Sequence, residues 1–211
     1  MKHTLTIRAE DYDGLRALLT EPPALEAAAY LLCGQSVTAA ELRLLARAVV
    51  PVEEHDYLVR EPDRLSIASR SYAAVAKRAA ADGDSVLFVH IHPGGRGEFS
   101  RQDDREEPKL MQFFAERAPN RLHGSLVLGG DPEFEGRVWA APGWAPVERV
   151  RLLGDRFRFK DALPRPTLYP TSLTGRCGPS VPTPNGSCGG STWELWGWAG
   201  QAPPSPSSSA G

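Results

Sequence analysis

The chain of 211 residues is poor in cysteine, in net charge and in long apolar runs. Its 24 Lys and Arg residues nearly balance 26 Asp and Glu residues, so no bulk basic surface is available for nucleic acid or an acidic membrane. No segment approaches the roughly 18 consecutive apolar residues of a membrane-spanning helix. The cysteines Cys33, Cys177 and Cys188 form no Cys-x-x-Cys pair, which argues against a disulfide framework and against a cysteine zinc site.

The first residues also lack the pattern of a secretory signal. The segment 1–8 is followed at once by Glu10, Asp11 and Asp13, whereas a signal peptide places an apolar stretch after its basic residues. We therefore expect a cytoplasmic protein with reduced thiols, which works without nucleic acid and without a membrane.

What the sequence does contain is a series of apolar patterns that predict interleaved strands and helices as far as residue 159. Strands are expected over 4–8, 42–52, 54–60, 86–91, 125–128 and 137–140, with a final hairpin formed by 147–153 and 156–159. Helices are expected over 11–19, 69–81 and 101–117, and 24–33 is predicted to be a helix that runs into a buried strand. Such alternation indicates an α/β or α+β domain with a mixed sheet.

The composition changes near residue 164. From there to the end the chain is rich in Pro, Gly, Ser and Thr, and its only charged residues are Arg165, Arg176 and Glu194. Because this stretch has no apolar periodicity, we predict one domain over 1–163 and a disordered low-complexity tail over 164–211.

The segment from His90 to Asp103 places three metal-binding side chains close together in the sequence. His90 and His92 are two residues apart at the end of the predicted strand 86–91, so they point to the same face of the sheet. The following loop returns the chain so that Asp103, in the next helix, supplies a third ligand. Two histidines, one carboxylate and an open fourth position are typical of a catalytic zinc site.

Hydrolysis at such a site needs two further groups. A carboxylate outside the ligand set must move the proton from water to the leaving amine, and a hydrogen-bond donor must meet the developing oxyanion. Ser100, three residues before Asp103, is placed for the second task, so the first requires an acidic residue from elsewhere in the chain.

The pattern His-x-His, seven residues, Ser, two residues, Asp resembles the JAMM signature of the JAB/MPN metalloprotease family, and Pro93 also matches the family habit. Upstream, the run from Glu26 to Gly34 reads Glu-Ala-Ala-Ala-Tyr-Leu-Leu-Cys-Gly and is similar to the family segment E-x-x-G-L-L-x-G. It departs from that segment in two ways: alanine replaces the first glycine, and the spacing to Gly34 is one residue longer.

The resemblance covers roughly residues 4–159 and implies a cytidine-deaminase-like α/β core, with a mixed sheet flanked by helices. It implies zinc held by His90, His92 and Asp103, Glu26 as the acid/base and Ser100 as the donor that steadies the tetrahedral intermediate. Glu21 is the nearest rival for the acid/base role. The implied substrate is a peptide or isopeptide bond at the C-terminus of a ubiquitin-like protein, although some members act on small conjugates or sulfur-carrier fusions.

The tail offers a second resemblance. It carries three tryptophans in six residues, Trp193, Trp196 and Trp198. GC-biased codons for 174–205, read one base earlier, encode a helix and a strand followed by the turn GVGGTGS, which resembles the start of an adenylating domain of ubiquitin-activating enzymes. We hypothesise that the tail is a frameshift product, and that the same gene or operon encodes such a domain.

Several alternatives stay open. Ser100 and Asp103 also fit a helix N-terminus, as a capping residue and a first-turn acid. The glycines of 94–97 lack the Gly-Lys-Ser/Thr ending of a phosphate loop and are expected to form a rim of the cleft. His3, His55 and His123 are expected to be structural or at the surface. The whole domain could also be a metal-free MPN-type scaffold for protein partners, or a zinc amidohydrolase for small molecules.

Overall fold

The apolar segments assemble into one mixed sheet in the computed structural model, which describes residues 1–21, 23–130, 133–140 and 143–162. The tail predicted over 164–211 lies outside these residues. Within them, the order of strands across the nine-stranded sheet is β11-β10-β1-β3-β2-β6-β7-β8-β9. The sheet strands are β1 (Lys2–Arg8), β2 (Ala27–Val37), β3 (Glu41–Pro51), β6 (Ser85–Ile91), β7 (His123–Leu128), β8 (Phe134–Ala140), β9 (Gly143–Pro146), β10 (Arg149–Leu153) and β11 (Arg158–Asp161).

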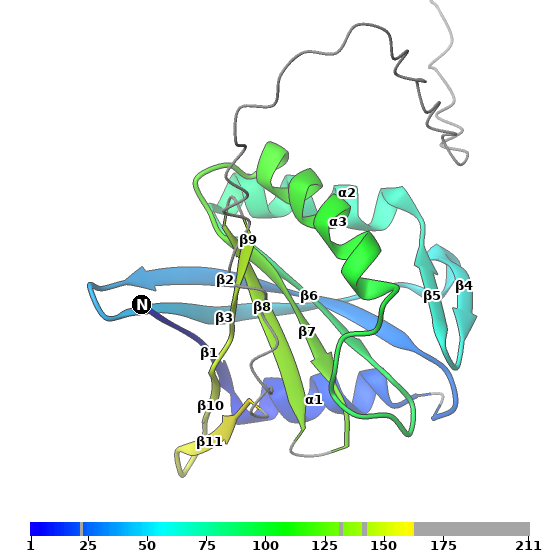
Figure 1. Ribbon diagram of the computed structural model, residues 1–211, viewed down its shortest axis with the longest axis horizontal. Helices are drawn as coiled ribbons and strands as arrows, with labels where there is room; N and C mark the ends of the chain where they lie inside the picture. The colour runs from blue at the N-terminus through cyan, green and yellow to red at the C-terminus, as the bar shows by residue number, and fades with distance from the viewer. Residues whose placement is uncertain (22, 131–132, 141–142, 163–211) are drawn as a thin grey trace, which may run out of the picture. The chain divides into compact units, whose positions relative to one another are not determined.

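Three helices cover the two faces of this sheet (Figure 1). They are α1 (Ala9–Leu19), α2 (Ser69–Asp82) and α3 (Asp103–Arg117). Helix α1 packs against one face, where Leu15 contacts a cluster that includes Leu87 of β6. Helices α2 and α3 pack against the other face, where Phe114 joins a cluster with Val86 of β6. Neighbouring residues of β6 therefore serve opposite faces, as the alternation of side chains along a strand requires.

Strand β6 lies in the interior of the sheet, between β2 and β7. It is antiparallel to β2 and parallel to β7, and its burial on both faces explains its near-continuous apolar sequence. The sheet also contains parallel pairing of β1 with β3 and β10, and antiparallel pairing elsewhere. The predicted mixed sheet flanked by helices is thus confirmed.

The prediction of a helix at the start of 24–33 is wrong. This segment instead enters β2 at Ala27, and the strand continues past Gly34 to Val37. Alanine has the highest helix propensity, but propensity is a weak predictor, and here the pairing of β2 with β3 and β6 overrides it.

The prediction of one strand over 54–60 is also wrong in part, because this segment belongs to a small hairpin outside the main sheet. The expected strand over 54–60 is a 3-10 turn (Glu54–Asp56) followed by β4 (Tyr57–Glu61), which pairs with the unpredicted β5 (Arg64–Ile67). Strand β9 was not predicted either, whereas the helices, the remaining strands and the final hairpin of β10 and β11 agree with expectation. No helix in the described part of the chain has the length and apolar character needed to cross a membrane.

Candidate metal centre

The end of β6 carries both histidines of the predicted ligand set. His90 is the last residue but one of β6 and pairs with Ala28 of β2, and His92 follows the strand directly. Their Nε2 atoms are 3.2 Å apart, which places both rings on the side of the sheet that faces α3. The expectation that a spacing of two residues brings the rings together is therefore met.

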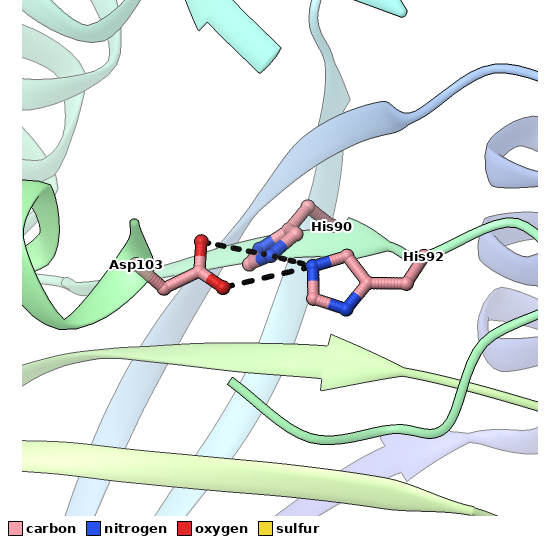
Figure 2. Close-up of side chains that lie close together, drawn as sticks. All are labelled: His90, His92 and Asp103. Atoms are coloured by element: carbon pink, nitrogen blue, oxygen red, sulfur yellow. Dashed lines mark hydrogen bonds and ion pairs between the residues drawn. The ribbon is translucent and has the colours of Figure 1, made fainter. Parts of the chain in front are cut away.

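The first turn of α3 supplies the carboxylate. Asp103 is the first residue of the helix, and its oxygens lie 3.3 Å from Nε2 of His90 and 3.6 Å from Nε2 of His92. Figure 2 shows the carboxylate facing both rings. The three side chains form a cluster that could hold a metal ion.

These separations fit a divalent metal ion. Ligand atoms that lie 2.0–2.2 Å from a tetrahedral zinc are about 3.3–3.6 Å from one another, and the observed separations are 3.2, 3.3 and 3.6 Å. Burial and the neighbouring His90 lower the pKa of His92, so its imidazole is neutral at pH 7 and offers a lone pair. The spacing of the three donors therefore suits a cation, and the lowered pKa of His92 favours the neutral imidazole that a metal binds.

Packing orients the ring of His90. The ring stacks on Phe88 at 5.5 Å between centroids and meets the edge of Phe99 at 6.3 Å. Its Nδ1 is buried and makes no hydrogen bond with a described residue. Aromatic contacts, rather than a hydrogen bond at Nδ1 from a described residue, therefore orient this imidazole, and its Nε2 faces Asp103 and His92.

Glu26 reaches the cluster through strand pairing. It precedes β2 directly, and the antiparallel register pairs Ala27 with Ile91, so the next position along places Glu26 beside His92. Its Oε1 lies 3.8 Å from Nε2 of His92. Burial, together with the charge of Asp103, raises the pKa of Glu26 to about 7, although His90 opposes this shift. This carboxyl group is buried, not on the surface of a helix.

The small hairpin holds the backbone of Glu26, a contribution that sequence reasoning missed. Arg60 of β4 donates from Nε to the carbonyl of Glu26 and from Nη2 to the carbonyl of Glu21, each at 3.0 Å. The amide of Glu26 donates to the carbonyl of Glu61 at 3.0 Å. No local sequence pattern predicts these hydrogen bonds, because they join residues more than thirty positions apart in the sequence.

Ser100 and Asp103 hold each other. The amide of Ser100 donates to Oδ2 of Asp103 at 2.6 Å, and the amide of Asp103 donates to Oγ of Ser100 at 3.2 Å. This reciprocal arrangement resembles a capping box, with Gln102 at the position before the helix. The Oγ of Ser100 therefore lies beside the Asp103 carboxylate, and a side-chain hydrogen bond from Ser100 helps to lower the pKa of Asp103.

The remaining candidates lie away from the cluster. Glu21 is exposed, whereas Glu26 is buried and lies 3.8 Å from His92. His123 is buried, accepts the amide of Val86 on Nδ1 at 3.0 Å and lies 3.0 Å from the carbonyl of Ala118. It is structural, as expected, and His3 and His55 do not join the cluster either.

A second buried polar cluster, which sequence reasoning also missed, lies behind Asp103. Arg137 of β8 is 3.0 Å from Glu107 and 2.7 Å from Asp104, both on α3. Its guanidinium also lies over the ring of Phe99 at 3.9 Å. Trp139 donates to Glu107 at 2.6 Å. These contacts fasten the first turn of α3, and the loop before it, to the sheet.

Comparison with known proteins identifies the family of the chain. No curated protein matches the chain. Among solved structures, a protein from Desulfitobacterium hafniense, determined in solution, is similar at 19% identity with a TM-score of 0.44, covering 72% of this chain and 92% of that one. The family model described as prokaryotic homologues of the JAB domain matches residues 9–142. This match spans more than half of the chain and includes every candidate site residue, so the chain belongs to the family of prokaryotic JAB-domain homologues.

Proposed function

We propose that this protein is a zinc-dependent hydrolase, which cleaves a peptide or isopeptide bond at the C-terminus of a ubiquitin-like protein. The observation that carries the proposal is the convergence of His90, His92 and Asp103 at separations of 3.2–3.6 Å. Membership of the JAB family supports hydrolysis as the chemistry, and the two histidines with one carboxylate support zinc as the metal.

The ligand residues have distinct tasks in this proposal. His90 and His92 would hold zinc through Nε2, and Asp103 would hold it through a carboxylate oxygen. When bound, zinc polarises a carbonyl and lowers the pKa of a water molecule. The bonds between Ser100 and Asp103 keep the carboxylate in place, so little reorganisation is needed when the metal binds.

Glu26 is the proposed acid/base. Its carboxylate lies 3.8 Å from a ligand nitrogen and outside the three-residue ligand cluster, where it can accept a proton from the attacking water and deliver it to the leaving nitrogen. A carboxyl group whose pKa is about 7 is well matched to both transfers at neutral pH.

Ser100 is the proposed oxyanion donor. Its hydroxyl oxygen accepts the amide hydrogen of Asp103, which orients the group, and in this proposal the hydroxyl hydrogen turns from the Asp103 carboxylate to the substrate. A donor held in advance needs no rearrangement when charge develops on the carbonyl oxygen, and this is the source of its effect.

The proposed substrate and setting rest on the family. We propose a ubiquitin-like protein or its conjugate as the partner, an adenylating enzyme in the same gene or operon as the source of that conjugate, and the cytoplasm as the location. Neither nucleic acid nor membrane is needed by this chemistry, and the net charge of −2 favours neither.

Elemental analysis and two substitutions test the proposal. Purified full-length protein should contain about one equivalent of zinc and hydrolyse ubiquitin-like fusions. Glu26→Gln should retain zinc and lose hydrolysis, because it keeps the shape of the side chain without its proton affinity. His92→Ala should lose both, because it removes a ligand.

Each alternative function has its own outcome in this test. Zinc below about half an equivalent would favour the metal-free scaffold, and cleavage of small amides but of no ubiquitin-like fusion would favour an amidohydrolase. Hydrolysis that survives in Glu26→Gln would assign the acid/base role to another residue.

A further inference from the structure

A pocket of about 290 Å³ lies beside the candidate metal centre. Helix α1, the segment before β2, the end of β6 and the turn after β7 contribute to its walls. His92 borders both this pocket and the metal cluster. Leu25 in the wall directly precedes Glu26, the proposed acid/base. The pocket and the metal cluster therefore adjoin one another at His92.

The walls of the pocket are largely uncharged. Leu19, Leu25 and Ile91 provide apolar surface, and no acidic side chain is among the described residues that line it. Arg16 of α1 is the one residue in this described lining with a permanent positive charge. A cation surrounded by apolar walls interacts strongly with an anion, because little water screens the two charges.

The guanidinium of Arg16 is held in place by one hydrogen bond, but one of its buried nitrogens makes none with a described residue. Its Nη2 donates to the carbonyl of Gly129 at 3.0 Å, which fixes the orientation of the planar group. Its Nη1 is buried and makes no hydrogen bond with a described residue. A buried donor without an acceptor costs free energy, and a carboxylate oxygen is the acceptor that a guanidinium binds best.

We propose that this pocket binds a carboxylate carried by the short peptide segment that flanks the scissile bond, with Arg16 as the binding residue. The proposal rests on the proposed function, since it assigns part of the substrate of the same site. The pocket is at the small end of the range for ligand sites, about 300–1,000 Å³, so it accommodates a short segment and not a folded domain. A peptide C-terminus and an acidic side chain present the same chemistry to Arg16.

Binding of short peptides to the full-length chain tests this inference without relying on catalysis. Nuclear magnetic resonance titrations would compare acetyl-Gly-Gly with its C-terminal amide, and acetyl-Asp-Gly-amide with acetyl-Asn-Gly-amide. The protein is freed of metal and kept at about pH 8, where an ordinary histidine is neutral, so that neither a metal ion nor a charged imidazole attracts the carboxylate. The pair that shows a preference for the acid identifies the source of the carboxylate.

We expect the acid of at least one pair to bind about tenfold more tightly than its neutral partner. Arg16→Met should abolish this preference. Arg78→Met is the matched control, because it removes an arginine from α2 whose partner is Asp82 at 3.7 Å, and it should keep the preference. Equal binding of acid and neutral peptides to the wild-type chain, or a preference that survives in Arg16→Met, overturns the proposal.

A second variant keeps the test decisive if Arg16→Met does not fold. Arg16→Lys retains the charge without the planar fork, so its preference for the acid should fall by about threefold. An unchanged preference in Arg16→Lys overturns the assignment to a guanidinium. A carboxylate preference in a protein that cleaves no ubiquitin-like fusion would end the proposed function and leave the anion site, whereas cleavage without the preference would do the reverse.

Discussion

Two buried polar clusters meet at the first turn of α3, and consecutive residues belong to different ones. Asp103 faces His90 and His92, and Asp104 faces Arg137. In the cluster at Arg137, one guanidinium pairs with carboxylates of opposite charge. In the cluster at Asp103, two imidazoles and a carboxylate point lone-pair atoms at a common region.

The comparison indicates that the polar groups at Arg137 stabilise the fold, whereas those at Asp103 are arranged to bind a ligand. The guanidinium of Arg137 is paired with the carboxylates of Asp104 and Glu107, and these opposite charges offset the cost of its burial. Two imidazoles and a carboxylate that converge on one region are the kinds of ligand that a divalent cation takes, so this arrangement becomes more favourable when a cation is present. We therefore expect the Arg137 cluster to govern the stability of the fold and the Asp103 cluster to govern metal binding and reaction.

Breaking the Arg137 cluster should have the largest effect. Arg137→Met leaves Glu107 buried without its cation, which should lower the free energy of unfolding by about 3–5 kcal/mol, measured by urea denaturation of metal-free protein. Adding Glu107→Gln should recover at least about 1 kcal/mol, because the unpaired charge is then gone. Arg78→Met on the surface should change stability by no more than about 0.5 kcal/mol. A loss below about 1 kcal/mol in Arg137→Met would contradict the structural role.

Substitution of Ser100 should affect both hydrolysis and the stability of the fold. Ser100→Ala should reduce hydrolysis of a ubiquitin-like fusion by about 10²–10³-fold, equivalent to about 2.7–4 kcal/mol, because the oxyanion loses a donor. Its cost in stability should be smaller, about 0.5–2 kcal/mol, through loss of the bond with the amide of Asp103. Steady-state kinetics and thermal unfolding measure the two effects on the same samples.

One result would contradict the role of Ser100 as an oxyanion donor. If hydrolysis falls by no more than about threefold, Ser100 serves only as a helix cap. Ser100→Thr is the control, since it keeps a hydroxyl at the same position and should retain most of the activity.

Zinc should stabilise the fold through the Asp103 cluster alone. At a free concentration of 100 times its dissociation constant, zinc should raise the free energy of unfolding by about 2.7 kcal/mol, because it binds the folded chain. His92→Ala should lose this increment, whereas Arg137→Met should keep it at its own lower stability. An increment that disappears in Arg137→Met would show that the two clusters are coupled. Thermal unfolding with and without a chelator measures each increment.

A third group of charges, at the surface, should contribute least. Glu41 of β3 accepts the hydroxyl of Thr4 at 2.7 Å and pairs with Arg151 and Arg43. The bond from Thr4, followed by those two arginines, lowers the pKa of Glu41 from 4.5 to about 2. The folded state therefore gains stability from ionised Glu41 above pH 4.5 and loses it as the pH falls toward 2.

The substitution Glu41→Gln should thus lower the free energy of unfolding by no more than about 1 kcal/mol at pH 7. The difference from wild type should shrink steadily as the pH falls from 4.5 toward 2, in a series of urea denaturations. Glu10→Gln, which removes an exposed pair with Arg8, is the control and should show no such pH dependence. A difference that grows in acid would refute the assignment.

Local patterns predicted most of the elements because they report on neighbours in the sequence. The helix expected over 69–81 is α2, which ends at Asp82, before Gly83 at a φ of 67°. The alanine run after Glu26 misled for the same reason, since its local preference for helix gave no sign of the two strands that enclose it. Short strands such as β5 and β9 hold too few residues for a period to be recognised.

The sequence by itself determined the candidate ligand set, because His90, His92 and Asp103 lie within one strand, one loop and one helix start, where spacing dictates direction. Only the tertiary structure decided that Glu26 would join them, because the antiparallel register of β2 and β6 brings it beside His92 across sixty-odd residues. The same holds for Arg60 behind Glu26, Arg137 behind Asp103 and Arg16 in the pocket. Their contacts depend on long-range pairing and burial, which no local period encodes.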